Sequence, residues 1–505
     1  MTNIELTKPA NRNAGILLHP TSIPGPYGIG DLGDEIVAFL DWAASAGFKW
    51  WQVLPLNPPG FGNSPYGCLS SLAGNPLLIS PQRLLQDGLL AQSDLDAAPA
   101  FREDQVQFSA VAEFKFQLLR KAFHNLASHR HLDHEFHAFV KGAEQKAWLD
   151  DYALFMALKT SHQAAGWWDW EPGLAKRQHK ALASARREHA EEVRFWEFTQ
   201  FLFFRQWSAV RSAARARNIR ILGDIPIYVA GDSADVWANR DLFQLDEDGR
   251  PTVVAGVPPD YFSKTGQRWG NPLYRWDALR ETKYAWWIER IRANLRMADA
   301  VRLDHFRGFA GYWEIPAGEE TAVNGRWMAA PGSELFEAVR KELGELPLVA
   351  EDLGLITQDV YDLRDELGIP GMKILQFGFT EADSVHLPHR IEPHTVVYTG
   401  THDNDTARGW FDSASAAERR IALAYLGPDP AFSWSMIRAA YTSVAETVIV
   451  PVQDILDLGA EARMNTPGAG KDNWSWRMRP SALTPAHAKR LQFLAEISGR
   501  LEKPA

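Results

Sequence analysis

Four acidic side chains stand at or just beyond the ends of short apolar segments: Asp224, Asp304, Glu351 and Asp403. A charge at the end of a buried strand costs free energy unless it is paired or has a chemical role. Like charges that lie close together raise the pKa of one of them, which divides a pair of carboxylates into an acid and a base. The four acids together therefore favour acid-base or nucleophilic chemistry over a purely structural role.

Enzymes that break or transfer a glycosidic linkage commonly use two carboxyl groups that flank the bond. Asp304, next to Arg302, suits an ionised nucleophile, because the neighbouring guanidinium favours the charged carboxylate. Glu351 follows the apolar residues 348–350 and suits a proton donor. Asp403 would then hold sugar hydroxyls and stabilise the positive charge of the transition state. Taken alone, Arg302 and Asp304 are also compatible with a structural ion pair.

A metal centre is a competing interpretation, because His305 and His402 each adjoin an aspartate. No set of residues has a standard zinc spacing, and only His19 follows the first apolar segment. We therefore predict no metal and no other cofactor. Cys68 is the single cysteine, which excludes an intrachain disulfide. We expect it to be a small apolar filler, with a nucleophilic role as the alternative.

Eight short apolar segments can position these acids. They lie near residues 16, 52, 221, 301, 348, 374, 397 and 450. Helical patterns separate most of them, for example over Glu35–Ala46 and over 192–216. Eight strands that alternate with helices predict an α/β fold of the TIM (β/α)8 barrel type. In this fold, active sites lie at the C-terminal ends of the strands. All four acids then share one face of the barrel.

Two regions interrupt the alternation and predict insertions between strands. Residues 81–195 carry apolar side chains at helical spacing and predict a helical insertion subdomain. Residues 230–290 predict a loop-rich insertion that covers the active-site cleft, since the segment 230–275 is polar and rich in Pro and Gly. The chain ends soon after the eighth strand. We therefore expect residues 1–505 to form a single catalytic domain with no separate C-terminal β domain.

The composition of the 505 residues restricts the partners. Hydrophobic residues make up 46% and charged residues 23%, as in globular proteins with a large core. A net charge of -10 without a basic block argues against binding to nucleic acid. No apolar run is long enough to span a membrane, so we expect no membrane partner. With one cysteine and no apolar signal segment, we expect a cytoplasmic protein. The 20 tryptophans suit stacking against sugar rings, although Trp196 and Trp207 are expected in the core.

Eight short segments occur in an order that resembles the 4-alpha-glucanotransferases of glycoside hydrolase family 77, the amylomaltases or disproportionating enzymes of the α-amylase superfamily. These segments are Asn63–Tyr66, Gly223–Tyr228, Gly256–Ser263, Gln267–Pro272, Arg302–Gly308, Ala350–Gly354, Gly400–Asn404 and Asn473–Trp476. The resemblance covers residues from about 14 to 495. It departs from the family pattern at Gly67, where we expect glutamine.

The resemblance implies a retaining double displacement through a covalent glycosyl-enzyme intermediate. A segment of an α-1,4-glucan would pass to the 4-OH of glucose or of another glucan. Asp304 matches the nucleophile, Glu351 the acid/base and Asp403 the transition-state stabiliser. An α-glucan hydrolase of the same superfamily is the alternative, because both reactions form the same intermediate. The expected partners are α-1,4-glucans and maltooligosaccharides, bound by a monomer or a homodimer.

The resemblance also implies substrate-binding residues, and the segment 256–263 matches a mobile loop that covers the cleft. These residues are Arg302, His402, Tyr66, Ser64, Asp224, Asp260, Tyr261, Trp269, Asn271 and Asn473. Structural alternatives remain for three of them: Tyr66 could be a packing residue, Asp260 could cap a turn, and Asp224 could hold Arg302. The cluster Trp167–Trp170 fits either an extra glucan contact or a plug between helices.

Overall fold

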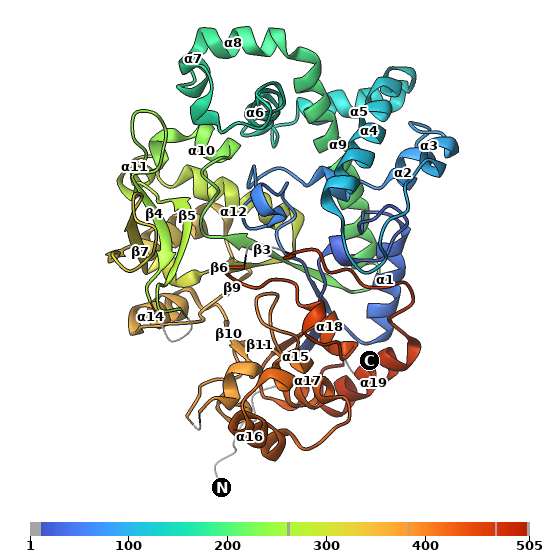
Figure 1. The fold of residues 1–505 in the computed structure, drawn as a ribbon, viewed down its shortest axis with the longest axis vertical. Helices are drawn as coiled ribbons and strands as arrows, with labels where there is room; N and C mark the ends of the chain where they lie inside the picture. The colour runs from blue at the N-terminus through green and yellow to red at the C-terminus, as the bar shows by residue number, and fades with distance from the viewer. Residues whose placement is uncertain (1–11, 260–262, 382, 470–471, 502–505) are drawn as a thin grey trace.

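The computed structural model describes residues 12–259, 263–381, 383–469 and 472–501, and its centre is an eight-stranded parallel sheet (Figure 1). The strands follow the order β10-β11-β12-β1-β2-β3-β6-β9. Their bounds are β1 (Asn13–Leu17), β2 (Trp50–Gln52), β3 (Arg220–Pro226), β6 (Ala300–Asp304), β9 (Leu348–Ala350), β10 (Gly371–Ile374), β11 (Thr395–Tyr398) and β12 (Thr447–Pro451). Each of the eight predicted segments corresponds to one of these strands.

The sheet curves so that its two outer strands meet. The backbone N–H of Ala350, at the end of β9, donates a hydrogen bond of 2.9 Å to the carbonyl of Pro370, which precedes β10. The strands are buried on both faces, as expected for a parallel sheet covered by helices. In β12, for example, Val448, Ile449 and Val450 are all fully buried. The TIM (β/α)8 barrel prediction is confirmed.

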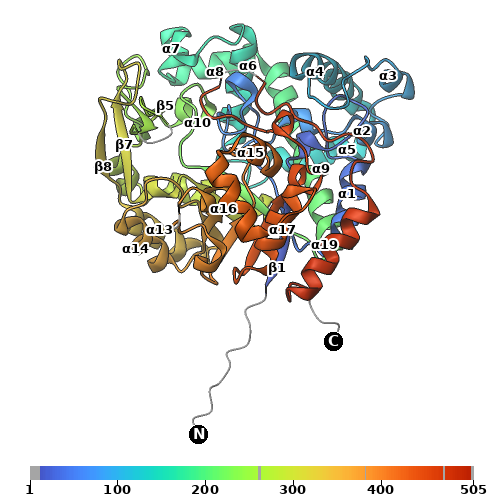
Figure 2. The ribbon, with the colours of Figure 1, turned by 60° about the horizontal axis from the view of Figure 1, so that its bottom comes forward.

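Amphipathic helices surround the barrel because each buries one apolar stripe against the strands. In α1, Ile36, Phe39, Leu40 and Ala43 recur at helical spacing and are buried. Helices α16 (Ala416–Leu426), α17 (Phe432–Thr442) and α19 (Pro485–Ile497) come to the front in Figure 2. The helices are α1 (Asp34–Ser45), α9 (Ala190–Arg215), α12 (Ala285–Met297), α13 (Gly332–Leu343), α14 (Gln358–Leu367), α15 (Ala407–Ser413), α16 (Ala416–Leu426), α17 (Phe432–Thr442), α18 (Val452–Ile455) and α19 (Pro485–Ile497).

The region 81–195 consists of short helices and the first turns of α9, and it forms the upper part of the molecule in Figure 1. Helix α6 is buried on every side from Tyr152 through Lys159 and packs against α9. The helices are α2 (Pro81–Gln86), α3 (Gln92–Asp96), α4 (Phe108–Asn125), α5 (Arg130–Val140), α6 (Leu149–Ser161), α7 (Pro172–Ala175) and α8 (His179–Glu188). In the described ranges, no helix has the length and apolar character needed to cross a membrane.

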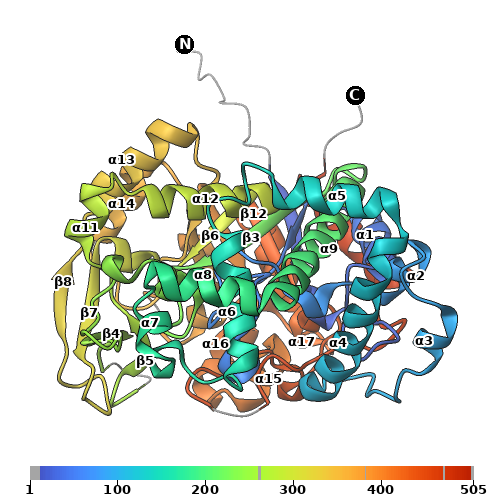
Figure 3. The same cartoon turned by 90° about the horizontal axis from the view of Figure 1, so that it is seen from above.

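The region 230–290 contains more regular structure than the loop-rich insertion expected from its composition. It holds α10 (Ala234–Ala238), β4 (Val253–Val257), β5 (Gln267–Pro272), α11 (Trp276–Glu281) and the first turns of the barrel helix α12. Strands β4 and β5 join β7 (Gly311–Pro316) and β8 (Arg326–Ala329) in a four-stranded antiparallel sheet of order β5-β4-β7-β8. This sheet stands at one side of the barrel in Figure 3.

Candidate active site

Arg302, on β6, lies at the centre of the acidic side chains. Its guanidinium Nη1 is 2.8 Å from Oδ2 of Asp224, and its Nη2 is 2.9 Å from Oδ1 of Asp304 and 3.9 Å from Oε2 of Glu351. The register of the barrel produces this contact, because Asp224 on β3 is directly opposite Arg302. Burial alone would lower the pKa of Arg302, but Asp224 and Asp304 raise it well above its usual range. Arg302 is therefore a permanent cation that joins three acids.

Glu351 begins the loop after β9, and backbone groups fix both of its oxygens. Oε2 accepts a hydrogen bond of 2.6 Å from the N–H of His305, and Oε1 accepts one of 3.2 Å from the N–H of Leu353. Burial raises the pKa of Glu351 to about 8; Arg302 opposes this shift and Asp304 adds to it. At neutral pH the side chain is therefore mostly protonated, which is the state that a general acid needs.

Asp304 and Glu351 face each other across Arg302. Since Oδ1 of Asp304 is 2.9 Å and Oε2 of Glu351 is 3.9 Å from the same Nη2, these two oxygens are at most about 6.8 Å apart. Retaining glycosidases separate their two carboxyl groups by about 5–5.5 Å, and inverting enzymes by about 6.5–9.5 Å. Both side chains keep accessible surface, 26% for Asp304 and 12% for Glu351. This limit accommodates the separation found in retaining enzymes and reaches only the lower end of the range found in inverting ones.

Asp403 follows β11 and has a partner on each carboxylate oxygen. The Nε2 atom of His402 is 3.3 Å from Oδ2, and the amide Nδ2 of Asn465 donates a hydrogen bond of 2.5 Å to Oδ1. Burial acts to raise the pKa of Asp403, but His402 and Asn465 outweigh it and lower the pKa below its ordinary range. The carboxylate is therefore ionised and held in one orientation.

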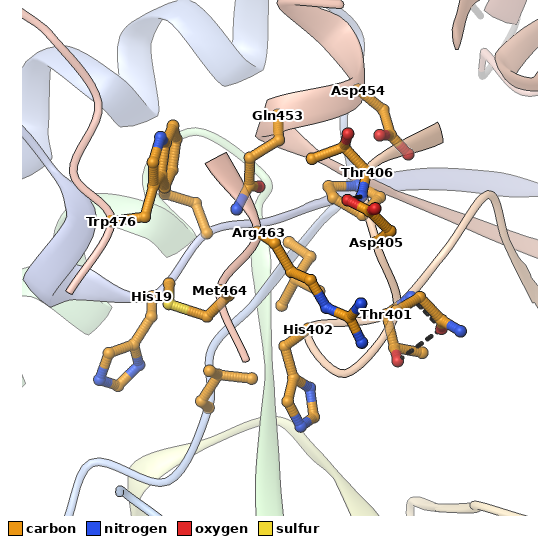
Figure 4. Close-up of a pocket in the computed structure, with 15 residues that line it drawn as sticks. His19, Thr401, His402, Asp405, Thr406, Gln453, Asp454, Arg463, Met464 and Trp476 are labelled. Atoms are coloured by element: carbon orange, nitrogen blue, oxygen red, sulfur yellow. Dashed lines mark hydrogen bonds between the residues drawn. The ribbon is translucent and has the colours of Figure 1, made fainter. Parts of the chain in front are cut away.

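The segment 463–465 clamps the turn that carries His402 and Asp403. Arg463 Nη2 donates to the carbonyl of Asp403 at 2.6 Å, and the N–H of Asn465 donates to the carbonyl of His402 at 3.1 Å. Figure 4 shows the Arg463 side chain extending towards the turn with Thr401 and His402. Neither Arg463 nor Asn465 was among the predicted site residues, because each is a single polar residue in a loop with no motif around it.

Tyr66 forms an aromatic wall beside these acids. Its hydroxyl donates to Oδ2 of Asp224 at 2.7 Å, and its ring stacks on His402 with centroids 4.9 Å apart and an angle of 16°. Trp474 completes the wall, with its ring 5.7 Å from that of Tyr66. Ser64 Oγ accepts a hydrogen bond from the N–H of Tyr66 and shapes the turn below the ring. Asp224 has no exposed side-chain surface, and its carboxylate contacts Arg302 and Tyr66.

Trp269, on β5, is the residue through which the antiparallel sheet contacts the site. Its exposed ring stands edge-on to His305, which follows the candidate nucleophile, with centroids 4.8 Å apart. The side-chain amides of two other predicted binding residues form hydrogen bonds with the backbone. Asn271 Nδ2 donates to the carbonyl of Val229 at 2.9 Å. Asn473 accepts from the N–H of Thr466 and donates to its carbonyl, closing the loop before Trp474. These two amides therefore shape loops at the edge of the site.

Two predicted binding residues, Asp260 and Tyr261, lie outside the described residues, as does part of the loop 256–263. Cys68 is buried, and burial raises the pKa of its thiol to about 12, so it is a neutral filler. Within the described ranges, no group of three or more His, Cys, Asp or Glu side chains is placed to hold a metal ion.

The tryptophan cluster of the helical insertion divides into two kinds of side chain. Trp167 and Trp170 are buried, and Trp170 packs against Phe155 and Trp237 at centroid distances of 5.5 and 5.7 Å. These two rings form the plug between helices that was one of the two expectations. Trp168 lies between them in sequence but keeps part of its ring exposed.

Comparison with known proteins gives similarity over nearly the whole chain. A family model described as 4-alpha-glucanotransferase matches residues 18–484. Two relatives with the name 4-alpha-glucanotransferase come from Thermus thermophilus, 49% identical over 97% of this chain and 99% of the relative, and from Synechocystis sp., 50% identical over 97% and 98%. The solved structure of amylomaltase from Streptococcus agalactiae in complex with acarbose superposes with a TM-score of 0.94 at 38% identity, covering 97% of this chain and all of that one.

Proposed function

Since this chain belongs to glycoside hydrolase family 77, the 4-alpha-glucanotransferases, and is an enzyme of that kind, we propose that the acidic cluster around Arg302 performs the transfer. The observation that carries the proposal is the pair formed by Asp304 and Glu351. Arg302 holds the first as a carboxylate at 2.9 Å, while burial keeps the second protonated at neutral pH. Such a pair provides a nucleophile and a general acid within one network.

In the first step, Asp304 attacks the anomeric carbon of the sugar and forms an ester bond to it. Glu351 gives its proton to the glycosidic oxygen, and the C–O bond to the leaving glucan breaks with its electrons remaining on that oxygen. Asp403, ionised and oriented by His402 and Asn465, stabilises the positive charge that develops on the ring. Arg302 orients the nucleophile.

In the second step, Glu351 is a carboxylate and acts as a base. It takes the proton of the acceptor's 4-OH while that oxygen attacks the anomeric carbon, and the ester bond to Asp304 breaks. A pKa near 8 suits both directions, because the group gives and takes its proton close to neutral pH. The configuration at the anomeric carbon is retained, since it is inverted twice.

We propose that the cleft accepts α-1,4-glucans and maltooligosaccharides, in keeping with the acarbose held by the amylomaltase from Streptococcus agalactiae. His402 and Tyr66 would line the subsite next to the cleaved bond, and Trp269 would stack on a neighbouring sugar. Ser64, Asn271, Asn473, Asp260 and Tyr261 are proposed as outer or supporting contacts, and Asp224 as a positioning residue. The proposed location is the cytoplasm, because a chain with a single cysteine forms no intrachain disulfide.

The alternative is an α-glucan hydrolase, in which water resolves the same ester. Incubation with maltotriose alone distinguishes the two reactions. A transferase gives glucose together with longer maltodextrins, while the total concentration of reducing ends stays nearly constant. A continuous rise in reducing ends identifies a hydrolase, and untouched maltotriose at high enzyme concentration would refute the catalytic assignment altogether.

A further inference from the structure

Trp168 is the aromatic side chain of the Trp167–Trp170 cluster that is only partly buried; its ring lies edge-on to that of Trp167, with centroids 5.7 Å apart. The turn that carries it is fixed to the barrel loop after β3. The indole Nε1 of Trp167 donates to the carbonyl of Gly231 at 2.9 Å, and Lys159 forms an ion pair of 2.6 Å with Asp232. The ring of Trp168 is therefore held in a defined place beside the loop, with part of its surface open to solvent.

Contacts between neighbouring residues connect this place with the candidate active site. A side chain added at Gly231 would meet Pro272 at 3.6 Å and the ring of Trp168 at 4.0 Å, so these three residues adjoin one another. Pro272 ends strand β5, and Trp269 lies three residues earlier on the same strand, about 10 Å away at the usual rise of a strand. Trp269 in turn touches His305, next to the proposed nucleophile. A series of contacts, which passes through the buried Pro272, thus connects Trp168 with Trp269 and His305.

Polar groups lie close to the Trp168 ring, and the guanidinium of Arg250 lies over it. Arg250 Nη2 lies 2.6 Å from Oδ1 of Asp169, and both side chains are about half exposed. The Arg250 guanidinium is 5.5 Å from the centroid of the Trp168 ring. Asp232 is also partly exposed. A partly exposed indole with a guanidinium over it and the neighbouring Asp169 carboxylate offers apolar surface together with donors and acceptors for sugar hydroxyls.

We propose that Trp168, with Arg250 and Asp169, forms an outer subsite for the α-1,4-glucan chain that already occupies the cleft. The inference rests on the proposed function and extends it: the subsite would bind only chains long enough to pass Trp269 and reach the helical insertion. The insertion would thereby add a chain-length preference to the barrel.

The test compares a short and a long substrate. Trp168→Ala is expected to leave kcat and KM for maltotriose within twofold of the wild type, while KM for amylose rises roughly 5- to 10-fold with little change in kcat. Trp168→Phe, which keeps an aromatic face, should restore most of the affinity for amylose. Phe493→Ala is the matched control, because Phe493 is 59% exposed on α19, outside the proposed surface, and should behave as the wild type with both substrates.

Three outcomes overturn the inference. They are an unchanged KM for amylose in Trp168→Ala, an equal loss with maltotriose and amylose, and a loss in the Phe493→Ala control of the same size. Calorimetry of maltoheptaose and maltotriose binding to the Asp304→Asn protein, with and without Trp168→Ala, tests the contact without turnover. If the wild type fails to disproportionate maltotriose, the proposed function fails. A selective loss of maltoheptaose affinity on removing Trp168 would still support the subsite, and equal affinities would refute it.

Discussion

The side-chain amide of Asn465 donates a 2.5 Å hydrogen bond to Oδ1 of Asp403, although 62 residues separate the two in sequence. His402 occupies the other oxygen of the same carboxylate. Asp403 is therefore held from two sides, and its angle to the sugar ring is set before the substrate arrives. Preorganised charge of this kind is what stabilises a developing positive charge without a reorganisation cost.

Replacing Asn465 by alanine should weaken catalysis without unfolding the protein. A hydrogen bond to a charged group contributes about 1.5–3 kcal/mol, so kcat with maltotriose should fall about 10- to 100-fold while KM changes little. Asn125→Ala removes a side-chain amide hydrogen bond of 2.9 Å to the carbonyl of Leu89 in the helical insertion and should leave kcat unchanged. Equal effects of the two substitutions on kcat would contradict the assigned role of Asn465.

The nucleophile and the acid/base can be separated by chemical rescue. Asp304→Ala and Glu351→Ala should each lower turnover of maltotriose by several orders of magnitude. With an activated α-glucosyl fluoride and added azide, Glu351→Ala should form its ester on Asp304 and release the α-glucosyl azide. Asp304→Ala should give the β-anomer, because azide enters from the vacated face. The opposite pairing of products would reverse the two assignments.

The pH profile of kcat/KM should show a basic limb near pH 8. Burial raises the pKa of Glu351 above its ordinary value, so the protonated acid is present below about pH 8 and is lost as the pH rises through it. The ratio kcat/KM reports the free enzyme, which is the state described here. Fluoride leaves with little help from an acid. With a glucosyl fluoride as the substrate, the pH profile of the first step should therefore lose most of its basic limb. A limb that persists unchanged with the fluoride would assign it to another group.

Asp224→Asn should destabilise the protein and shift this limb. Breaking a buried ion pair costs about 3–5 kcal/mol, and we expect about 3 kcal/mol in urea unfolding, because Asp304 still neutralises Arg302. Loss of one negative charge near Arg302 also favours ionisation of Glu351, so its basic limb should move to lower pH. A wild-type limb in a correctly folded variant would show that Asp224 does not act through Arg302.

The eight barrel strands could be predicted because each is a short apolar run bounded by turn residues and buried on both faces. The antiparallel sheet could not. Strand β4 pairs with β7, whose residues Gly311–Pro316 come more than fifty positions later, so no local pattern joins them. Residues 267–272 also contain Gly and Pro, which are typical of loops. The aromatic and β-branched residues Tyr312, Trp313 and Ile315, which are common in strands, were the available signal for β7.

The catalytic acids were predictable because strand order places them on one face, whereas their supporting contacts depend on side-chain geometry. The zero exposure of Asp224 follows from the β3–β6 register, which the sequence does not specify. Asn465 and Asn473 both look like loop amides. Only the fold directs the first to a carboxylate and the second to the backbone of its own loop.

Strand β1 has its two neighbours at opposite ends of the chain: Gly15 pairs with Trp50 on β2 and with Ile449 on β12. During synthesis at about 5–20 residues per second, β1 waits roughly 20–90 s for β12 to emerge. Until then one edge of the sheet is open, and Asp304, Glu351 and Asp403 have no closed barrel to fix their spacing. A nascent chain therefore acquires catalytic competence only as its last strand is made, and the open edge of β1 is the point at which a chaperone or a second nascent chain would engage it.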